Sequence, residues 1–230
     1  MSTIAENVQK IREQISDAAI NRGADPGLIR LVAASKTKSA SEIQKAIAAG
    51  VDAVGENRQQ EMSGKLLQGA YEGAPLHFIG HLQRNKVNKI VGVCQLIESV
   101  SSVALLTQIG NRATSMGIVQ DILIECNIAG EDSKSGIMAE ELPMLFDTAS
   151  QTPGIMVRGL MAIPPIATEK AGNRPYFARM YELFVDIMSK KYDNVRMDFL
   201  SMGMSADFID AICEGSNMIR LGTAIFGTRD

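Results

Sequence analysis

The residues with the clearest chemical potential in this sequence are a lysine near the end of a buried strand and two segments rich in glycine and hydroxyl side chains. Lys36 follows the continuous apolar run 29–34, which is typical of a strand that is buried on both faces. In parallel α/β folds, ligands bind at the carboxyl ends of the strands, so a lysine there can meet a ligand as well as solvent. A lysine that only returns the chain to water is the simpler alternative.

The segments "LSMGMSAD" and "RLGTAIFG" have the composition of phosphate-binding loops. The first carries Ser201, Gly203 and Ser205 between a predicted strand and a helix, and the second carries Gly222 and Thr223 after the last predicted strand. Glycine lets backbone N–H groups approach an anion, and hydroxyl groups add further donors. Tight turns alone would also explain these glycines. Because both segments follow the seventh and eighth strands, where barrels usually bind phosphate, we predict a phosphate site.

A lysine that faces a phosphate site indicates a carbonyl ligand held as a Schiff base. In a sugar-phosphate aldolase the lysine attacks the substrate carbonyl, whereas in other proteins it holds pyridoxal 5′-phosphate (PLP) as an internal aldimine. Arg220 could reach the ring nitrogen of a pyridine cofactor, where a permanently protonated arginine would weaken the electron sink. A third alternative is a scaffold that binds a phosphorylated metabolite and uses Lys36 only for charge. The residues alone leave these alternatives open.

The elements that must position these residues are strands alternating with helices. An amphipathic helix with Ile4, Val8, Ile11 and Ile15 on one face opens the chain. Strands are predicted at 29–34, 52–55, 76–79, 95–98, 120–126, 156–161, 197–200 and 218–221, and helices at 39–50, 58–67, from about 85, 102–115, 139–149, 176–190 and 206–213. This alternation, without an interdomain linker, predicts one (β/α)8 (TIM) barrel domain over 1–230 with an extra N-terminal helix. A doubly wound sheet is the alternative, but no GxGxxG motif follows an early strand.

In such a barrel, polar residues at the carboxyl ends of the strands converge on one mouth. The residues predicted at these strand ends, most of them polar, are Lys36, Glu56, Asn57, His81, Asn127, Met161, Ser201, Arg220, Gly222 and Thr223. Lys134, in the loop after the fifth strand, is a further candidate for handling the ligand as it enters or leaves. His77 and His81 are four residues apart, a spacing that does not let two strand residues share a metal, so we predict no metal site.

Composition excludes several classes of partner. Twenty-three Lys and Arg against 26 Asp and Glu, with no basic block among aromatic residues, argue against nucleic acid. No uncharged apolar stretch approaches the ~20 residues that span a bilayer, so no membrane association is expected. The cysteines Cys94, Cys126 and Cys213 lie in apolar segments without a CxxC motif, which predicts reduced, buried thiols in a cytoplasmic protein.

Eight segments between Lys36 and Arg229 together resemble the pyridoxal phosphate homeostasis protein family (YggS/PROSC). They are "ASKTK", "GENRQQE", "HFIGHLQRNK", "ESV", "SKSG", "RGLMAIP", "LSMGMS" and "MIRLGTAIFGTR". The resemblance covers essentially the whole chain, and it departs from the family at Leu76, where tryptophan is frequent. It implies a barrel like the N-terminal domain of alanine racemase that binds PLP and manages its supply without established catalysis.

Carried over by position, the resemblance implies a role for each residue of the predicted mouth. Lys36 would form the aldimine, Arg220 would address the ring nitrogen, and Asn57 with His81 would line the pocket. The phosphate would be held by Ser201, Gly222 and Thr223. PLP-dependent apo-enzymes would receive the cofactor from a monomeric protein. Racemase activity is not expected, because Lys36 serves only one face of a substrate and the four tyrosines fall in or beside predicted helices.

Overall fold

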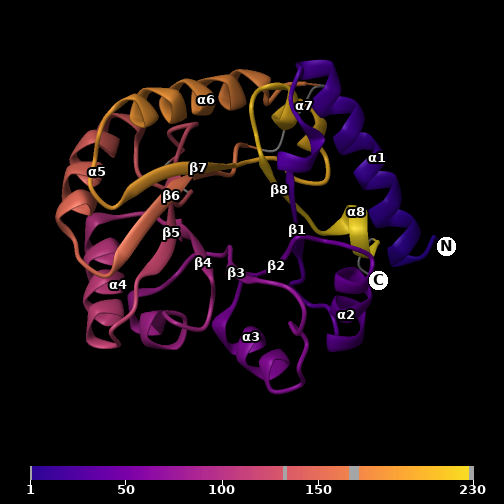
Figure 1. Ribbon diagram of the computed structural model, residues 1–230, viewed down its shortest axis with the longest axis horizontal. Helices are drawn as coiled ribbons and strands as arrows, with labels where there is room; N and C mark the ends of the chain where they lie inside the picture. Colours follow the sequence, from indigo (N-terminus) through magenta and orange to yellow (C-terminus); the bar gives the residue numbers. More distant parts are fainter. Residues whose placement is uncertain (1, 132–133, 166–170, 228–230) are drawn as a thin grey trace.

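The computed structural model describes residues 2–131, 134–165 and 171–227, and parts of the segments 133–136 and 218–229 therefore lie outside the described residues. Within these ranges eight parallel strands close into a barrel in sequential order, with β8 paired to β1 (Figure 1). The strands are β1 (Arg30–Ala34), β2 (Ala53–Glu56), β3 (Leu76–Phe78), β4 (Leu96–Val100), β5 (Gln120–Cys126), β6 (Ile155–Ala162), β7 (Val195–Ser201) and β8 (Met218–Leu221). The predicted (β/α)8 barrel is confirmed.

Helices surround the strands as an outer ring (Figure 1). They are α1 (Ile4–Arg22), α2 (Ala40–Ala48), α3 (Gln59–Leu66), α4 (Val103–Ser115), α5 (Leu142–Gln151), α6 (Arg174–Ser189), α7 (Phe208–Cys213) and α8 (Thr223–Phe226), with 3-10 helices η1 (Pro26–Leu28), η2 (Arg84–Lys89) and η3 (Ala139–Glu141). The α-helix predicted from about Asn85 is wrong, because this segment forms only η2. Its buried residue is Val87 alone, which leaves no apolar stripe to stabilise a longer helix.

The predicted N-terminal helix is present and covers one side of the barrel. Thr3 and Glu6 form a capping box at the start of α1, and Gly23 ends the helix in the left-handed conformation at φ 76°. Its buried face includes Val8, Ile11 and Ile15. α1 lies beside α7 and α8 (Figure 1), so the chain's first helix packs against its last ones.

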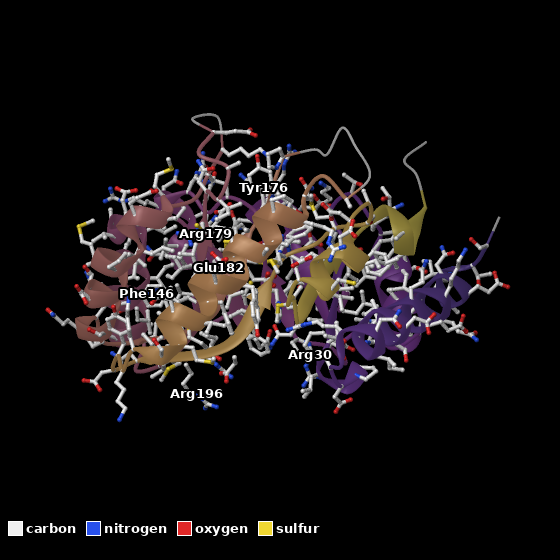
Figure 2. All side chains as sticks on the ribbon, turned by 90° about the horizontal axis from the view of Figure 1, so that it is seen from above. Arg30, Phe146, Tyr176, Arg179, Glu182 and Arg196 are labelled. Atoms are coloured by element: carbon white, nitrogen blue, oxygen red, sulfur yellow. The ribbon has the colours of Figure 1, made fainter. Side chains whose placement is uncertain are left out.

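The two ends of the barrel are structurally distinct because all strands run in the same direction. Figure 2 shows Arg30 and Arg196, near the starts of β1 and β7, on one side and Tyr176, at the start of α6, on the opposite side. We call the end where the strands finish the mouth and the other end the base. Near the base, Arg158 of β6 pairs with Asp121 of β5 and with Asp198 of β7, whose Oδ2 lies 2.6 Å from its Nε.

An apolar layer fills the barrel interior between the two ends. It consists of the buried side chains Val32, Ala53, Leu96, Leu123, Met161 and Met218, with Phe199 packed against them. Close packing of β6 on β7 depends on Gly159, which has φ 143° and would place a Cβ 1.8 Å from the carbonyl oxygen of Phe199. Only glycine fits this approach. The register shift between Val157 and Gly159 lies at the same place.

The cysteines match the predicted pattern in part. Burial raises the pKa of Cys94 and of Cys126 to about 12, so both thiols stay protonated and unreactive. Cys213 is only half-buried, because it ends α7 near the surface, and the prediction of three buried thiols is wrong there. Within the described part of the chain, no helix has the length and apolar composition needed to cross a bilayer.

Candidate functional site

Lys36 occupies a tight turn directly after β1, at the mouth. The carbonyl of Ser35 accepts a hydrogen bond from the N–H of Lys38 at 3.0 Å, which closes a four-residue turn with Lys36 at its second position. Lys36 is exposed, whereas the β1 residues that precede it are largely buried. The strand therefore delivers a primary amine to the mouth, where a ligand can reach it.

The predicted phosphate segments meet, and Ser205 is the hydroxyl at their junction. The Oγ atom of Ser205 accepts hydrogen bonds from the N–H groups of Gly222 at 3.3 Å and of Ala224 at 3.2 Å. Thr223 lies between these two residues at the start of α8 and is exposed. The Ser205 hydroxyl thus satisfies two backbone N–H groups at the ends of β7 and β8, and its own proton stays available to an acceptor such as a phosphate group.

Ser201 lies away from this junction, inside the barrel. It is the last residue of β7, is fully buried, and donates from Oγ to Glu98 Oε2 at 2.6 Å while accepting a hydrogen bond from Arg220. Glu98 also pairs through Oε1 with His77 Nδ1 at 2.7 Å. The structure thus joins β3, β4, β7 and β8 in one buried chain, which we call the arginine network: His77, Glu98, Ser201 and Arg220.

The arginine network holds a buried cation in a fixed orientation. Arg220 is 4% exposed and donates a second hydrogen bond to the carbonyl of Ala162 at 3.0 Å. Burial lowers the pKa of Arg220, and the negative charges of Glu98 and Glu125 act in the opposite direction. Burial alone would raise the pKa of Glu98, but the hydrogen bond from His77 and the charge of Arg220 leave it lowered. The two groups therefore support each other's charged forms.

Asn57 and His81 line one cavity of about 420 Å³, together with Arg58, Gln83 and Lys86. The loops after β2 and β3 come close there because Gly80 has no side chain: a Cβ on Gly80 would lie 2.3 Å from the carbonyl oxygen of Asn57. His81 Nδ1 also lies 3.1 Å from the hydroxyl of Ser135, which brings the loop after β5 to the same region. The structure thus brings together the two residues that the sequence predicted as pocket lining.

Other residues predicted at the mouth have different roles. Met161 is buried in the apolar layer, and Glu56 is fully buried under the Lys36 turn. In the loop after β5, Asn127 donates to the carbonyl of Glu131 at 2.8 Å, and Lys134 Nζ lies 3.7 Å from Glu131 Oε2. Among residues 2–131, 134–165 and 171–227, no three His, Cys, Asp or Glu side chains are grouped to hold a metal ion.

Sequence reasoning missed Glu98 and His77 as parts of the site. Both lie in strands whose other residues are mostly apolar. The available signal was the ionisable residue inside each strand, because such side chains are rarely buried without a partner. This rule applies directly to Glu98, which is 0% accessible and lies in the middle of β4. Its partner Ser201 is 103 residues away in sequence, and no local pattern links the two.

Glu125 near Arg220 is expected to make the stability of the ligand-free protein depend on pH. Its Oε2 is buried without a hydrogen-bond partner among the described residues, and burial raises its pKa to about 7 against the opposing charge of Arg220. The unfolded chain loses this proton near pH 4.5 and the native protein near pH 7, so stability falls as pH rises between these values. The total loss is about 3 kcal/mol.

Glu125→Gln removes this titration, and we expect it to be more stable than the native protein at pH 8 but nearly equal to it at pH 5. Urea unfolding at both pH values measures the difference. Glu182→Gln is the matched control, because Glu182 is an exposed residue of α6. A difference between Glu125→Gln and the native protein that does not grow with pH would contradict the prediction.

Comparison with known proteins gives a consistent assignment. The family model for the alanine racemase N-terminal domain matches residues 1–230. The pyridoxal phosphate homeostasis protein of Pseudomonas aeruginosa is 40% identical over 230 residues, which cover 100% of this chain and 97% of that protein. The structure of PipY from Synechococcus elongatus with PLP bound is 31% identical, with a TM-score of 0.82 and coverage of 98% of this chain and 100% of PipY.

Alanine racemase of Clostridium difficile shares the fold alone. It is 15% identical with a TM-score of 0.75, and the similarity covers 97% of this chain and 57% of the racemase. The curated relatives, in contrast, are similar over their whole length and carry the homeostasis name. With identity of this extent and a shared fold over 98% of its length, this chain belongs to the pyridoxal phosphate homeostasis protein family.

Proposed function

We propose that this protein binds PLP as a Schiff base on Lys36 and acts in intracellular PLP homeostasis as a carrier, not as an enzyme. The observation that carries the proposal is the convergence of three groups at one mouth. These are the exposed amine of Lys36, the buried guanidinium of Arg220 and the donors around Ser205. They come from β1, β8 and the loop after β7, and β8 is paired with both of the other strands. The solved structure of PipY with bound PLP supports the choice of ligand.

Each group suits one part of the cofactor. The phosphate accepts hydrogen bonds from Thr223 and from the Ser205 hydroxyl, and it replaces Ser205 Oγ as the acceptor of the Gly222 N–H. We assign to Ser205 the contact that the sequence pattern suggested for Ser201. Ser201 instead holds Arg220, which addresses the ring nitrogen. Asn57 and His81 form the wall beside the ring. When bound, PLP supplies an aldehyde that condenses with an amine and a ring that withdraws electrons.

The remaining parts of the proposal concern the protein as a whole. Residues 1–230 act as one PLP-binding domain of a monomeric, cytoplasmic protein, and PLP-dependent apo-enzymes are its recipients. An exposed Lys36 supports this role, because a Schiff base that water and other amines can reach is readily released. The same exposure is unfavourable for an enzyme that must protect a carbanion from solvent.

The test of the proposed function is to load the purified protein with PLP and follow transfer. The loaded protein should be yellow, should lose its colour on borohydride reduction, and should carry the reduced label on the peptide that contains Lys36. Mixed with an apo-aminotransferase, it should restore aminotransferase activity. A protein that takes up no PLP would contradict the proposal and favour a sugar-phosphate aldolase. A protein that binds PLP without a reducible bond would favour a scaffold that uses Lys36 only for charge.

Ser205→Ala is expected to weaken binding of phosphorylated ligands, and Ser201→Ala is the matched comparison. Losing one charge-assisted hydrogen bond costs about 1.5–3 kcal/mol, or about 10- to 150-fold in affinity. Pyridoxine 5′-phosphate and pyridoxine are suitable probes, because they differ only in the phosphate. Ser205→Ala should reduce the affinity for the phosphorylated probe alone. If Ser201→Ala shows this phosphate-specific loss and Ser205→Ala does not, our assignment of the two serines is wrong.

Amino-acid racemisation by the loaded protein is expected to be negligible. Racemisation needs an acid and a base on opposite faces of the substrate, and three of the four tyrosines are engaged elsewhere. Tyr71 donates to Glu56, Tyr181 lies under Arg22, and Tyr192 packs on Phe146. The measurement is deuterium entry at the α-carbon of D- and L-alanine. Turnover typical of enzymes, about 1–10³ per second, would contradict the carrier proposal.

A further inference from the structure

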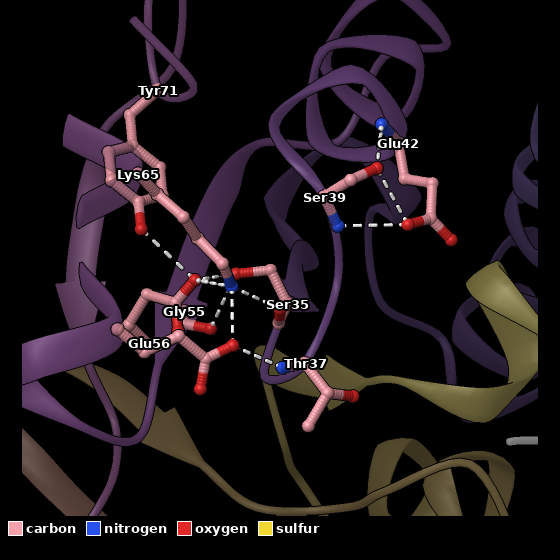
Figure 3. A network of polar contacts seen from close by, with 9 residues as sticks. Ser35, Thr37, Ser39, Glu42, Gly55, Glu56, Lys65 and Tyr71 are labelled. Atoms are coloured by element: carbon pink, nitrogen blue, oxygen red, sulfur yellow. Dashed lines mark hydrogen bonds and ion pairs between the residues drawn. The ribbon is translucent and has the colours of Figure 1, made fainter. Parts of the chain in front are cut away.

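The residue before Lys36 is tied to the neighbouring strand and helix (Figure 3). The hydroxyl of Ser35 donates to Glu56 Oε1 at 2.6 Å, and its carbonyl accepts a hydrogen bond from Lys65 Nζ at 2.8 Å. Glu56 ends β2 and is fully buried, and Lys65 lies in the last turn of α3. The turn therefore begins from a backbone position that β2 and α3 both fix.

The residue after Lys36 has an unusual backbone conformation that a second carboxylate holds. Thr37 has φ 66°, in the left-handed region that β-branched residues rarely adopt. Its N–H donates to Glu61 Oε1, so a side chain of α3 holds the turn. A conformation of this kind persists only where the surroundings enforce it, and it is concentrated at functional sites.

Lys65 joins the two carboxylates into one unit, which we call the loop clamp: Glu56, Glu61 and Lys65. The ammonium of Lys65 lies 2.7 Å from Glu56 Oε1 and 2.7 Å from Glu61 Oε1, and the residue is 7% exposed. Burial alone would raise the pKa of Glu61, but the hydrogen bonds from Lys65 and Thr37 leave it lowered. Glu61 is thus a fixed, charged acceptor.

We propose that Glu61 and Lys65 are positioning residues for the Schiff-base lysine, an inference that rests on the proposed function. The loop clamp holds Ser35 on one side of Lys36 and Thr37 on the other, so the Lys36 side chain leaves the turn in one direction. Without the clamp, the turn relaxes to conformations that threonine prefers, and the amine spends less time where it meets an aldehyde. Lys65 does not compete as a nucleophile, because its ammonium is paired with two carboxylates.

Glu42, in the first turn of α2, provides a matched control. Glu42 Oε2 accepts hydrogen bonds from the N–H and the hydroxyl of Ser39, each at 2.8 Å, as the capping box of α2 (Figure 3). Like Glu61, it is a carboxylate that fixes backbone near Lys36. It accepts no hydrogen bond from Ser35 or Thr37 in the described structure. Glu42→Ala therefore reports general loosening of the loop, and Glu61→Ala reports loss of the clamp.

The experiment compares two readouts in the native protein and in the variants Glu61→Ala, Glu61→Gln and Glu42→Ala. The first is the rate constant of imine formation with PLP, followed by absorbance at saturating ligand. The second is the affinity for pyridoxine 5′-phosphate, which has an alcohol in place of the aldehyde and reports the pocket without the covalent bond. Glu61→Ala should slow imine formation by about ten- to a hundredfold, as expected when a reacting group is misplaced. Its affinity for the alcohol should stay within about threefold of native.

The other variants complete the test. Glu61→Gln should be intermediate in rate, because its amide oxygen can still accept the Thr37 N–H, and this variant serves alone if Glu61→Ala does not fold. Glu42→Ala should form the imine at the native rate. A native rate in Glu61→Ala, or an equal loss in both readouts, would overturn the positioning role. If even the native protein forms no imine, the proposed function fails first, which the native measurement identifies by itself.

Discussion

Lys36→Arg is expected to abolish the borohydride-stable PLP label on the peptide that contains residue 36. A guanidinium stays protonated and does not condense with an aldehyde, whereas the native lysine should take up about one label per chain. Because arginine keeps the positive charge at the mouth, the variant should still bind pyridoxine 5′-phosphate. Its loss should therefore appear in the covalent step and not in recognition of the phosphate. Mass spectrometry of the reduced, digested protein provides the measurement.

The neighbouring Lys38 is the control for this experiment. It lies in the same loop, and its ammonium is 3.4 Å from Glu42 Oε1. Lys38→Arg should keep the label on the peptide of Lys36, because the amine that reacts is unchanged. If Lys36→Arg binds PLP with native affinity and native spectrum, the covalent role assigned to Lys36 is wrong. Equal loss of label in both variants would show that labelling depends on the loop as a whole and not on the amine of Lys36.

Glu98→Ala is expected to destabilise the protein by about 3–5 kcal/mol, the cost of removing one partner of a buried ion pair. It leaves the guanidinium of Arg220 buried without the carboxylate of Glu98, whose Oε2 is 3.8 Å from Arg220 Nη1. The hydroxyl of Ser201 and the ring of His77 lose their acceptor at the same time. The free energy of unfolding, measured by urea denaturation near neutral pH, gives the size of the effect.

Two comparisons separate charge from packing at this position. Glu98→Gln keeps the volume and an acceptor oxygen, so it should cost less than Glu98→Ala. Glu182→Ala removes an exposed carboxylate that pairs with Arg179 on α6, and it should change stability by no more than about 1 kcal/mol. If Glu98→Ala is as mild as Glu182→Ala, the arginine network does not contribute as a connected unit.

The fold was predictable because its signals are local. Eight apolar runs separated by amphipathic segments specify the barrel, and the strand ends bring Lys36, Gly222 and Thr223 to the mouth. η2 was mispredicted because its residues have no apolar stripe and its conformation depends on neighbours. Helix boundaries elsewhere moved by a few residues, as at η3, which continues into α5 at Leu142.

The inside of the site was less predictable because it depends on pairs distant in sequence. Ser201 and Ser205 are four residues apart and look equally suited to phosphate, yet the first points into the barrel and the second faces Gly222. Which of the two serines faces the phosphate site depends on where β7 ends. The strand ends at Ser201, and Glu98 holds the Ser201 hydroxyl inside the barrel. The loop clamp was unpredictable for the same reason, since Glu61, which accepts the hydrogen bond from Thr37, lies 24 residues further along the chain.

The apolar layer inside the barrel acts as an electrical insulator between two charged ends. On its base side lie Arg158, Asp121 and Asp198, and on its mouth side lie Arg220 and Glu98. Phe199 packs against this layer and its ring lies under the guanidinium of Arg158, so apolar side chains separate the two sets of ion pairs. Substitutions among the base residues can therefore change the stability of the barrel without changing the charges at the mouth, so stability and ligand exchange can evolve separately.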